Sequence, residues 1–189
     1  MKELIYKLLF RFRATANRVV IPAYPLSRKF GFDRGRPVDR YFIEKFLSEN
    51  VNLIKGKVLE VTDNTYTLKY GKNITQSDVL DIDSNNKKAN IISDIRNIKP
   101  VKDNTYDTII LTHVLGMIDD IDSAVSEVYR VLKPGGHVFV TVATFAPNLA
   151  NNKAFWRITK EGAIYLFGKH FKLRKITCEA VGNYYAGQA

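Results

Sequence analysis

The hydrophobic pattern of the chain alternates between short, continuously apolar runs and a longer segment with helical spacing. Residues 109–111 and 138–142 are such runs, which are typical of parallel strands covered on both faces. Between them, apolar residues recur at helical spacing over residues 118–132, and Pro134-Gly135-Gly136 then predicts the end of the helix and a turn. A strand, a helix and a strand in this order predict a right-handed crossover of an α/β sheet.

Three more strands are predicted upstream of this unit, at residues 57–61, 77–83 and 90–94. The connection at residues 84–89 is too short for a crossover helix, which normally needs about ten residues or more. We therefore predict a mostly parallel α/β sheet whose helices are trimmed. Outside the sheet, the pattern predicts helices over residues 38–47 and 160–167 and a last strand over residues 171–180.

The first 36 residues differ from the rest of the chain in charge. Between Met1 and Arg40, ten lysines and arginines oppose three acidic residues, so most of the net charge of +10 lies there. Apolar residues from Leu4 to Phe12 fall on one helical face with basic side chains around it, which predicts a basic amphipathic helix. Such a helix either lies on an anionic membrane or docks on protein. We divide the chain into this N-terminal helix and loop, residues 1–36, and one α/β domain, residues 37–189.

Several classes of protein are excluded by composition. A single cysteine, Cys178, allows no disulfide framework within the chain, and the three scattered histidines predict no metal site. No apolar run reaches the roughly 20 residues of a membrane span, and basic residues interrupt the apolar N-terminus where a signal peptide would be continuous. A cytoplasmic protein is therefore expected, with peripheral membrane contact through the N-terminal helix as an open alternative.

Polar residues gather where the predicted strands end, at residues 60–64, 81–83, 93–95 and 112–113. Ligands of open α/β sheets bind at these carboxyl ends. Asp81 and Asp83 are suited to accept hydrogen bonds from a ribose diol, although an acid at this place also caps turns. Near the start of the domain, Arg34, Arg36 and Arg40 lie among glycines, which suits a clamp for an anion; a solvated basic loop is the alternative.

Two segments of the chain resemble a known family. Residues 103–110 (Asp-Asn-Thr-Tyr-Asp-Thr-Ile-Ile) and 131–136 (Val-Leu-Lys-Pro-Gly-Gly) are similar to the fourth strand, helix and fifth strand of class I S-adenosylmethionine-dependent methyltransferases. Residues 34–41, 58–60 and 63–67 resemble a narrower branch, which is associated with glycosyltransferases and with O-methylation of sugars in surface glycans. The resemblance implies a Rossmann-like methyltransferase sheet with a basic helical extension, S-adenosylmethionine as cofactor, a sugar or glycan acceptor and a glycosyltransferase as partner.

The resemblance also implies roles for single residues. By position, the methionine part of the cofactor falls to Glu60, Thr62, Asp63 and Asn64, the ribose to Asp81 or Asp83, the adenine to Ser93, Asp94 and Ile95, and the surroundings of the methyl group to Thr112 and His113. Arg40 and Tyr41 would cover the site from the preceding helix. The family's first loop is glycine-rich, whereas here it contains no glycine. Asp63 or Asn64 can take a positive φ at modest cost, and these two are the residues predicted to do so if the loop binds the cofactor. Either the cofactor is held differently, through Tyr66 and Arg40, or its affinity is weak; a pseudoenzyme is the remaining alternative.

Methyl transfer to a hydroxyl needs a base, and His113 is the first candidate because its ordinary pKa allows it to accept a proton at neutral pH. A histidine that only packs at the strand end is the alternative. The acceptor is expected to contact Arg34, Arg36, Trp156, Arg157 and Tyr165, with Trp156 equally suited to a core. Two other functions compete: a non-catalytic methyltransferase-like module that binds a glycosyltransferase or a membrane, and a nucleic-acid methyltransferase. The last is disfavoured because the basic residues are confined to one arm.

Overall fold

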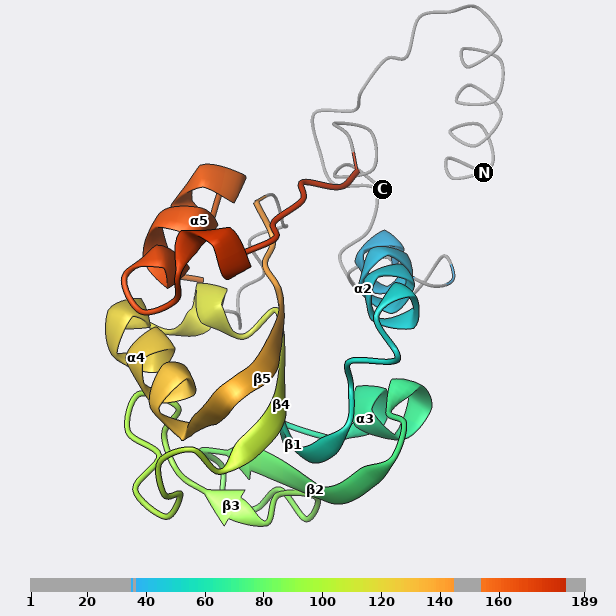
Figure 1. The fold of residues 1–189 in the computed structure, drawn as a ribbon, viewed down its shortest axis with the longest axis vertical. Coiled ribbons are helices and arrows are strands. Elements are labelled where there is room, and N and C mark those ends of the chain that lie inside the picture. The colour runs from blue at the N-terminus through green and yellow to red at the C-terminus, as the bar shows by residue number, and fades with distance from the viewer. Residues whose placement is uncertain (1–34, 36, 145–153, 183–189) are drawn as a thin grey trace, which may run out of the picture.

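The computed structural model describes residues 35, 37–144 and 154–182. The predicted N-terminal helix, Arg34, Arg36 and the segment 145–153 lie outside the described residues. Five parallel strands form one sheet in the order β3-β2-β1-β4-β5 (Figure 1). The strands are β1 (Gly56–Val61), β2 (Ile74–Asp81), β3 (Ile91–Ile92), β4 (Tyr106–Thr112) and β5 (Leu132–Thr141). The predicted parallel α/β sheet is confirmed.

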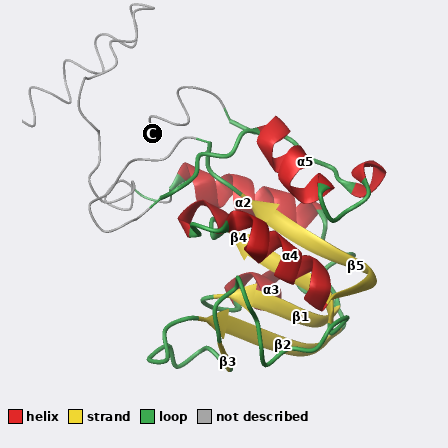
Figure 2. Cartoon of the chain, turned by 90° about the vertical axis from the view of Figure 1, so that its left-hand side faces the viewer, coloured by secondary structure: helices red, strands yellow, loops and turns green. Residues whose placement is uncertain are grey.

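Helices cover both faces of the sheet (Figures 1 and 2). Helices α2 (Val38–Glu49) and α3 (Thr65–Tyr70) pack on one face, and α4 (Ile121–Val131) and α5 (Lys160–Gly168) on the other. Two 3-10 turns, η2 (Leu115–Met117) and η3 (Leu173–Lys175), complete the regular elements. In Figure 2, α4 lies in front of the sheet and α3 lies behind it.

Alternation along the central strands builds a separate core on each face, because successive side chains of a strand point to opposite sides. Val58 of β1 and Ile110 of β4 pack with Ile43 and Leu47 of α2. Their neighbours Leu59, Ile109 and Leu111 pack instead into the core with α4, where the helix contributes Ala124, Val125, Val128 and Val131. Burial on both faces is the reason that these strands read as continuous apolar runs.

The Pro-Gly-Gly segment follows the helix as predicted, but it already belongs to β5, which begins at Leu132. The pairing of β4 with β5 changes register between Tyr106 and Thr108. A Cβ on Gly136 would come within 2.9 Å of the Asp107 carbonyl oxygen, so this position needs glycine for close approach of the backbones.

Two elements differ from the sequence-based prediction. The strand predicted at residues 171–180 is wrong, because the segment holds η3 and no strand up to Gly182. Phe171 packs edge-on against Tyr129 of α4, so the segment follows the helical layer while its basic side chains stay exposed. Helix α3 was not predicted, because six residues are too few for a helical period to show.

Within the described residues, no helix combines the length and apolar character that crossing a membrane requires.

Candidate functional site

The carboxyl ends of β1, β2 and β4 lie at one edge of the sheet, and the N-terminus of α2 packs beside them (Figure 1). The four segments that meet here are the β1–α3 loop, the turn after β2, the β4 end and the first turn of α2. Hydrogen bonds and an ion pair join the β1–α3 loop to the turn after β2, and the first turn of α2 contacts His113 after β4 and Tyr66 of α3. This edge is the candidate site.

The β1–α3 loop bends at Thr62, whose φ is 73°. The prediction that Asp63 or Asn64 takes a positive φ is wrong: Asn64 has a φ of −110°, and Asp63 is outside the left-handed region. A β-branched residue is strained in this region, which normally belongs to glycine. The loop therefore keeps a glycine conformation without glycine. Thr62 donates its N–H to the Leu80 carbonyl at 2.9 Å, which continues the pairing of β1 with β2.

Glu60, near the end of β1, is buried and holds the start of α3. It is only 2% exposed, and its carboxylate accepts hydrogen bonds from the N–H groups of Tyr66 and Thr67 at 3.2 and 2.8 Å and from the Thr67 hydroxyl at 2.7 Å. Burial raises the pKa of Glu60, and these hydrogen bonds oppose that shift. Both carboxylate oxygens thus hold the first turn of α3. From the sequence, they were expected beside the methionine part of the cofactor instead.

Arg40 of α2 contacts the first turn of α3, directly after the β1–α3 loop. Its Nη1 donates to the Tyr66 hydroxyl at 2.9 Å, and the charge of Asp63 acts on it favourably. The structure thus places Arg40 beside Tyr66, and whether the two hold the cofactor stays a prediction. Tyr41, the next residue of the helix, is 57% exposed and packs edge-on against Phe42.

The two acids after β2 differ in the partners they have. Asp81 accepts the Asp83 N–H at 2.9 Å on one oxygen and the Asn86 side-chain amide at 2.6 Å on the other. Asp83 is exposed and uses Oδ1 for the backbone and side chain of Asn85. Its Oδ2 has no partner within the described part of the chain. Of the pair, Asp83 is the one with a carboxylate oxygen that has no hydrogen-bond partner among the described residues, whereas each Asp81 oxygen already accepts one hydrogen bond.

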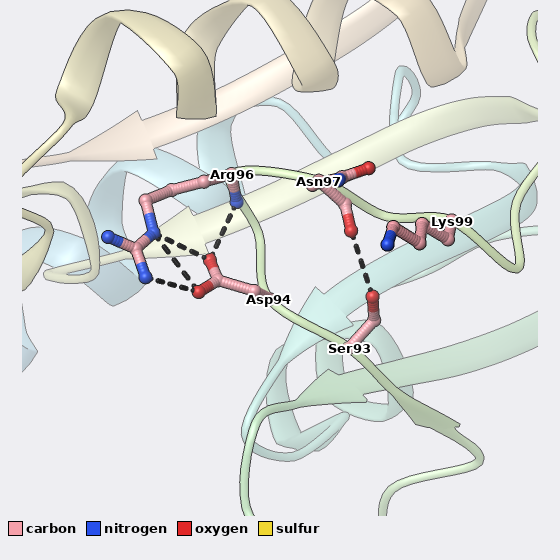
Figure 3. Close-up of a pocket in the computed structure, with 5 residues that line it drawn as sticks. All are labelled: Ser93, Asp94, Arg96, Asn97 and Lys99. Carbon is pink, nitrogen blue, oxygen red and sulfur yellow. Dashed lines mark hydrogen bonds and ion pairs between the residues drawn. The ribbon is translucent and has the colours of Figure 1, made fainter.

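After β3 the chain forms a shallow hollow lined by Ser93, Asp94, Arg96, Asn97 and Lys99 (Figure 3). Arg96 holds both oxygens of Asp94 and donates through Nη1 to Asp119 at 2.6 Å. These hydrogen bonds lower the pKa of Asp94. Ser93 donates to the Asn97 carbonyl, and the side chain of Ile95 is buried in the core with α4. Of the three residues predicted to face adenine, only Ser93 and Asp94 border the hollow.

His113 follows the end of β4 in the left-handed region, with a φ of 58°. The ring Nδ1 of His113 lies 3.6 Å from Oδ2 of Asp39 in α2, and the backbone N–H of His113 donates to the Thr141 carbonyl. Burial lowers the pKa of His113 below its ordinary 6.5; Asp39 opposes this shift and the charge of Arg40 adds to it. Strained backbone at a non-glycine residue is enriched at functional sites. Asp39 was missed by sequence reasoning, although it lies in the arginine-rich segment that was singled out.

Thr112 is the last residue of β4 and pairs with Thr141 of β5. The Thr141 hydroxyl is buried and has no hydrogen-bond partner among the described residues. This hydroxyl lies next to His113 and was not among the predicted site residues, because the end of β5 has the sequence pattern of an ordinary buried strand.

Exposed apolar side chains border the loop after β4. Phe155 and Trp156 donate their N–H groups to the Gly116 carbonyl, and the Trp156 indole donates to the Ile118 carbonyl at 2.8 Å. Met117, Phe155 and Trp156 are 47%, 56% and 44% exposed, so Trp156 is not a core residue. We call these three side chains the apolar rim.

The other described residues that were predicted to contact the acceptor are Arg157 and Tyr165. Arg157 follows Trp156 and is exposed. Tyr165 lies on α5 with the Lys169 ammonium 5.1 Å from its ring centre, in the layer of α4 and α5. No group of three or more acidic, cysteine or histidine residues suited to a metal occurs among the residues that the structure describes.

Residues 52–140 match the family model described as "Methyltransferase domain". Among curated proteins, the chain is 36% identical over 72 residues to the demethylmenaquinone methyltransferase of Lactiplantibacillus plantarum, covering 38% of this chain and 30% of that protein. It is 46% identical over 41 residues to the demethylmenaquinone methyltransferase of Streptomyces avermitilis, covering 22% and 18%. The chain thus spans less than a third of the length of these relatives.

Two solved structures share the fold. One is the protein in complex with the Haloferax volcanii Trm112 methyltransferase activator, with a TM-score of 0.57 and 17% identity over 76% of this chain and 73% of that one. The other is the cyclase SpnF, with a TM-score of 0.53 and 19% identity over 88% and 68%. The fold alone does not fix the reaction, because one of these neighbours is named as a cyclase.

Proposed function

We propose that this chain is a class I S-adenosylmethionine-dependent methyltransferase, which transfers the cofactor's methyl group to an acceptor that gives up a proton to His113. The observation that carries the proposal is the pair of His113 and Asp39 at the carboxyl end of β4, with the imidazole half-buried and the His113 backbone strained. Fold, cofactor class and a basic group at the ligand edge point to the same reaction class.

The residues at the edge fit the cofactor. The free oxygen of Asp83 suits the ribose diol, and the left-handed turn at Thr62 keeps the loop conformation in which glycine-rich loops receive such ligands. Arg40 provides a guanidinium for the methionine carboxylate, with Asp63 and Tyr66 beside it. S-adenosylmethionine itself supplies the methyl group on a positively charged sulfur.

His113 takes the acceptor's proton in this proposal. Because its pKa is lowered, the imidazole is neutral at pH 7 and is ready to accept. Asp39 lies on the Nδ1 side of the ring, which leaves Nε2 for the acceptor, and its charge stabilises the imidazolium that forms. The same arrangement also serves a weakly acidic hydroxyl, since proximity then provides much of the rate.

We take a hydroxylated aromatic ring as the first acceptor class, with the methyl group added to a ring carbon. The apolar rim suits a flat apolar acceptor, and the curated relatives are named as methyltransferases of demethylmenaquinone. Ionisation of the ring hydroxyl, whose proton His113 would take, makes the ring carbon nucleophilic. The new carbon–carbon bond would form as the methyl–sulfur bond breaks and its electrons stay on sulfur, and loss of the hydrogen from the methylated ring carbon with return of a proton to the oxygen would restore the aromatic hydroxyl. The shortness of the matches keeps this assignment a proposal.

The sugar hydroxyl expected from the sequence is the second acceptor class. Its one structural support is the half-exposed Trp156, since an aromatic ring stacks on the apolar face of a sugar. Neither relative reported above is named for a sugar.

The test is a methyl-transfer assay with two panels of acceptors, reduced demethylmenaquinone analogues and glycan sugars, read by mass spectrometry for the gain of one methyl group. We expect product from the quinol panel, and we expect His113→Ala to lose it. The matched control is His170→Ala, which should keep it; His170 follows the end of α5 and its ring contacts Tyr129 of α4. Product from the sugar panel alone would mean that the acceptor is a sugar hydroxyl and not a hydroxylated aromatic ring. Unchanged turnover by His113→Ala would remove the proposed base.

A further inference from the structure

Asn86 lies in the turn after β2 and connects two parts of the candidate edge. Its side-chain Nδ2 donates to the Thr62 carbonyl at 2.7 Å and to Oδ2 of Asp81 at 2.6 Å. Its Oδ1 accepts the Lys88 N–H at 3.0 Å, which fixes the orientation of the amide, because only the nitrogen can donate to the other two. One side chain therefore joins the β1–α3 loop to the acidic end of β2.

Thr62 needs such a tie. Its φ of 73° is strained for a β-branched residue, and a strained conformation persists only where neighbouring groups impose it. The Thr62 N–H is held by the Leu80 carbonyl as part of the sheet. The Thr62 carbonyl, on the other side of the bend, is held by the Asn86 amide. The bend at Thr62 is thus fixed on one side by the pairing of β1 with β2 and on the other by the side chain of Asn86.

A second contact makes the turn and the loop one unit. The Lys88 ammonium lies 3.7 Å from Oδ2 of Asp63, and together with hydrogen bonds from Thr65 it lowers the pKa of Asp63 against the effect of burial. Asp81, held by Asn86, accepts the N–H of Asp83, the acid that keeps a free oxygen. Asn86 therefore acts on both sides of the place that the ribose would occupy.

We propose that Asn86 is a positioning residue for the cofactor, which imposes on the glycine-free loop the conformation that glycine would adopt unaided. Asn86 acts through Thr62 and Asp81 and does not itself need to touch the cofactor. The inference rests on the proposed function. It predicts that the contribution of Asn86 to cofactor binding disappears when residue 62 is glycine, since glycine enters the left-handed region without strain.

The test measures binding of S-adenosylhomocysteine by calorimetry to the full chain in four forms: wild type, Asn86→Ala, Thr62→Gly and the double variant. In the Thr62 background, Asn86→Ala weakens binding by about tenfold, the size of one hydrogen bond lost at a charged or strained group. In the Thr62→Gly background, the same substitution changes binding by less than about twofold. Asn52→Ala is the matched control, because Asn52 is an exposed asparagine whose one side-chain hydrogen bond among the described residues is accepted from Lys72.

Hydrogen exchange of the residue 62 amide gives a second readout that needs no ligand. Asn86→Ala speeds this exchange in the Thr62 background and leaves it unchanged in the Thr62→Gly background. An equal loss of binding in both backgrounds would overturn the inference, as would unchanged binding and exchange in Asn86→Ala. If wild type binds no S-adenosylhomocysteine, the proposed function fails and the cofactor role of Asn86 fails with it, while the exchange rates still report whether Asn86 holds the loop.

Discussion

Replacing Glu60 with glutamine separates two roles for the acid at the end of β1. The structure assigns this carboxylate to α3, where it accepts from two backbone N–H groups and the Thr67 hydroxyl. Glutamine has nearly the same shape but keeps one acceptor oxygen and turns an amide N–H₂ toward donors. At least one charge-assisted hydrogen bond is lost, and one buried N–H of α3 is left without a partner.

The expected size of the effect follows from these contacts. A hydrogen bond to a charged group contributes about 1.5–3 kcal/mol, and an unpaired buried donor costs about 1–3 kcal/mol. The cost of burying the Glu60 charge, which disappears in the variant, offsets part of this loss. We expect Glu60→Gln to lower the free energy of unfolding at pH 7 by about 2 kcal/mol, measured by urea denaturation.

The pH dependence of this difference has a defined sign. Burial raises the pKa of folded Glu60 above its ordinary 4.5, so its favourable contribution is complete below that pH and declines as the pH rises through the raised value. The wild type therefore exceeds the variant in stability by more at pH 4.5 than at pH 7. If Glu60→Gln instead unfolds like the wild type and loses S-adenosylhomocysteine binding, Glu60 contacts the cofactor and does not hold α3.

Four further substitutions test the site. His113→Ala lowers kcat by about 100-fold or more, with cofactor binding kept, in a steady-state assay. The wild-type kcat falls as the pH drops through a His113 pKa below 6.5, and Asp39→Asn moves this fall to lower pH, because Asp39 raises that pKa. Asp83→Asn weakens S-adenosylhomocysteine binding about tenfold in calorimetry, with stability within about 0.5 kcal/mol of wild type. Thr62→Gly stabilises the protein by about 0.5–1 kcal/mol in urea, since relief of about 1–2 kcal/mol of strain exceeds the entropic cost of glycine.

Each of these expectations has a result that would count against it. If the fall of kcat at low pH occurs at the same pH in Asp39→Asn as in the wild type, Asp39 does not act on the pKa of His113. If Asp83→Asn binds S-adenosylhomocysteine as tightly as the wild type, Asp81 and not Asp83 holds the ribose. A destabilised Thr62→Gly would mean that Thr62 makes favourable contacts that outweigh its strain.

The sheet could be predicted from sequence because its central strands are buried on both faces. Ile109, Ile110 and Leu111 are each at most 1% exposed, so their strand appears as an unbroken apolar run. The short α3 has no such signal, since it is held by one capping carboxylate. At residues 171–180 the alternation of Leu173 and Ile176 with basic residues looked like a strand, but no neighbouring strand pairs with the segment.

The site could be predicted in place but not in orientation. Residues at the strand ends do lie at one edge, yet Glu60 turns to α3 and the side chain of Ile95 enters the core, and sequence position carries no information on side-chain direction at a loop. The contacts of Asp39 with His113 and of Asn86 with Thr62 join segments that are far apart in the sequence. They depend on how the layers pack, so a single sequence offers no pattern for them.

The most direct test of the account is calorimetric titration of the full chain with S-adenosylhomocysteine, repeated with Asp83→Asn and with the Asn52→Ala control. The account predicts one bound molecule per chain, binding that is about tenfold weaker in Asp83→Asn, and no change in Asn52→Ala. Absence of both binding heat and a thermal shift at millimolar ligand would contradict it and would favour a methyltransferase-like module that binds no cofactor.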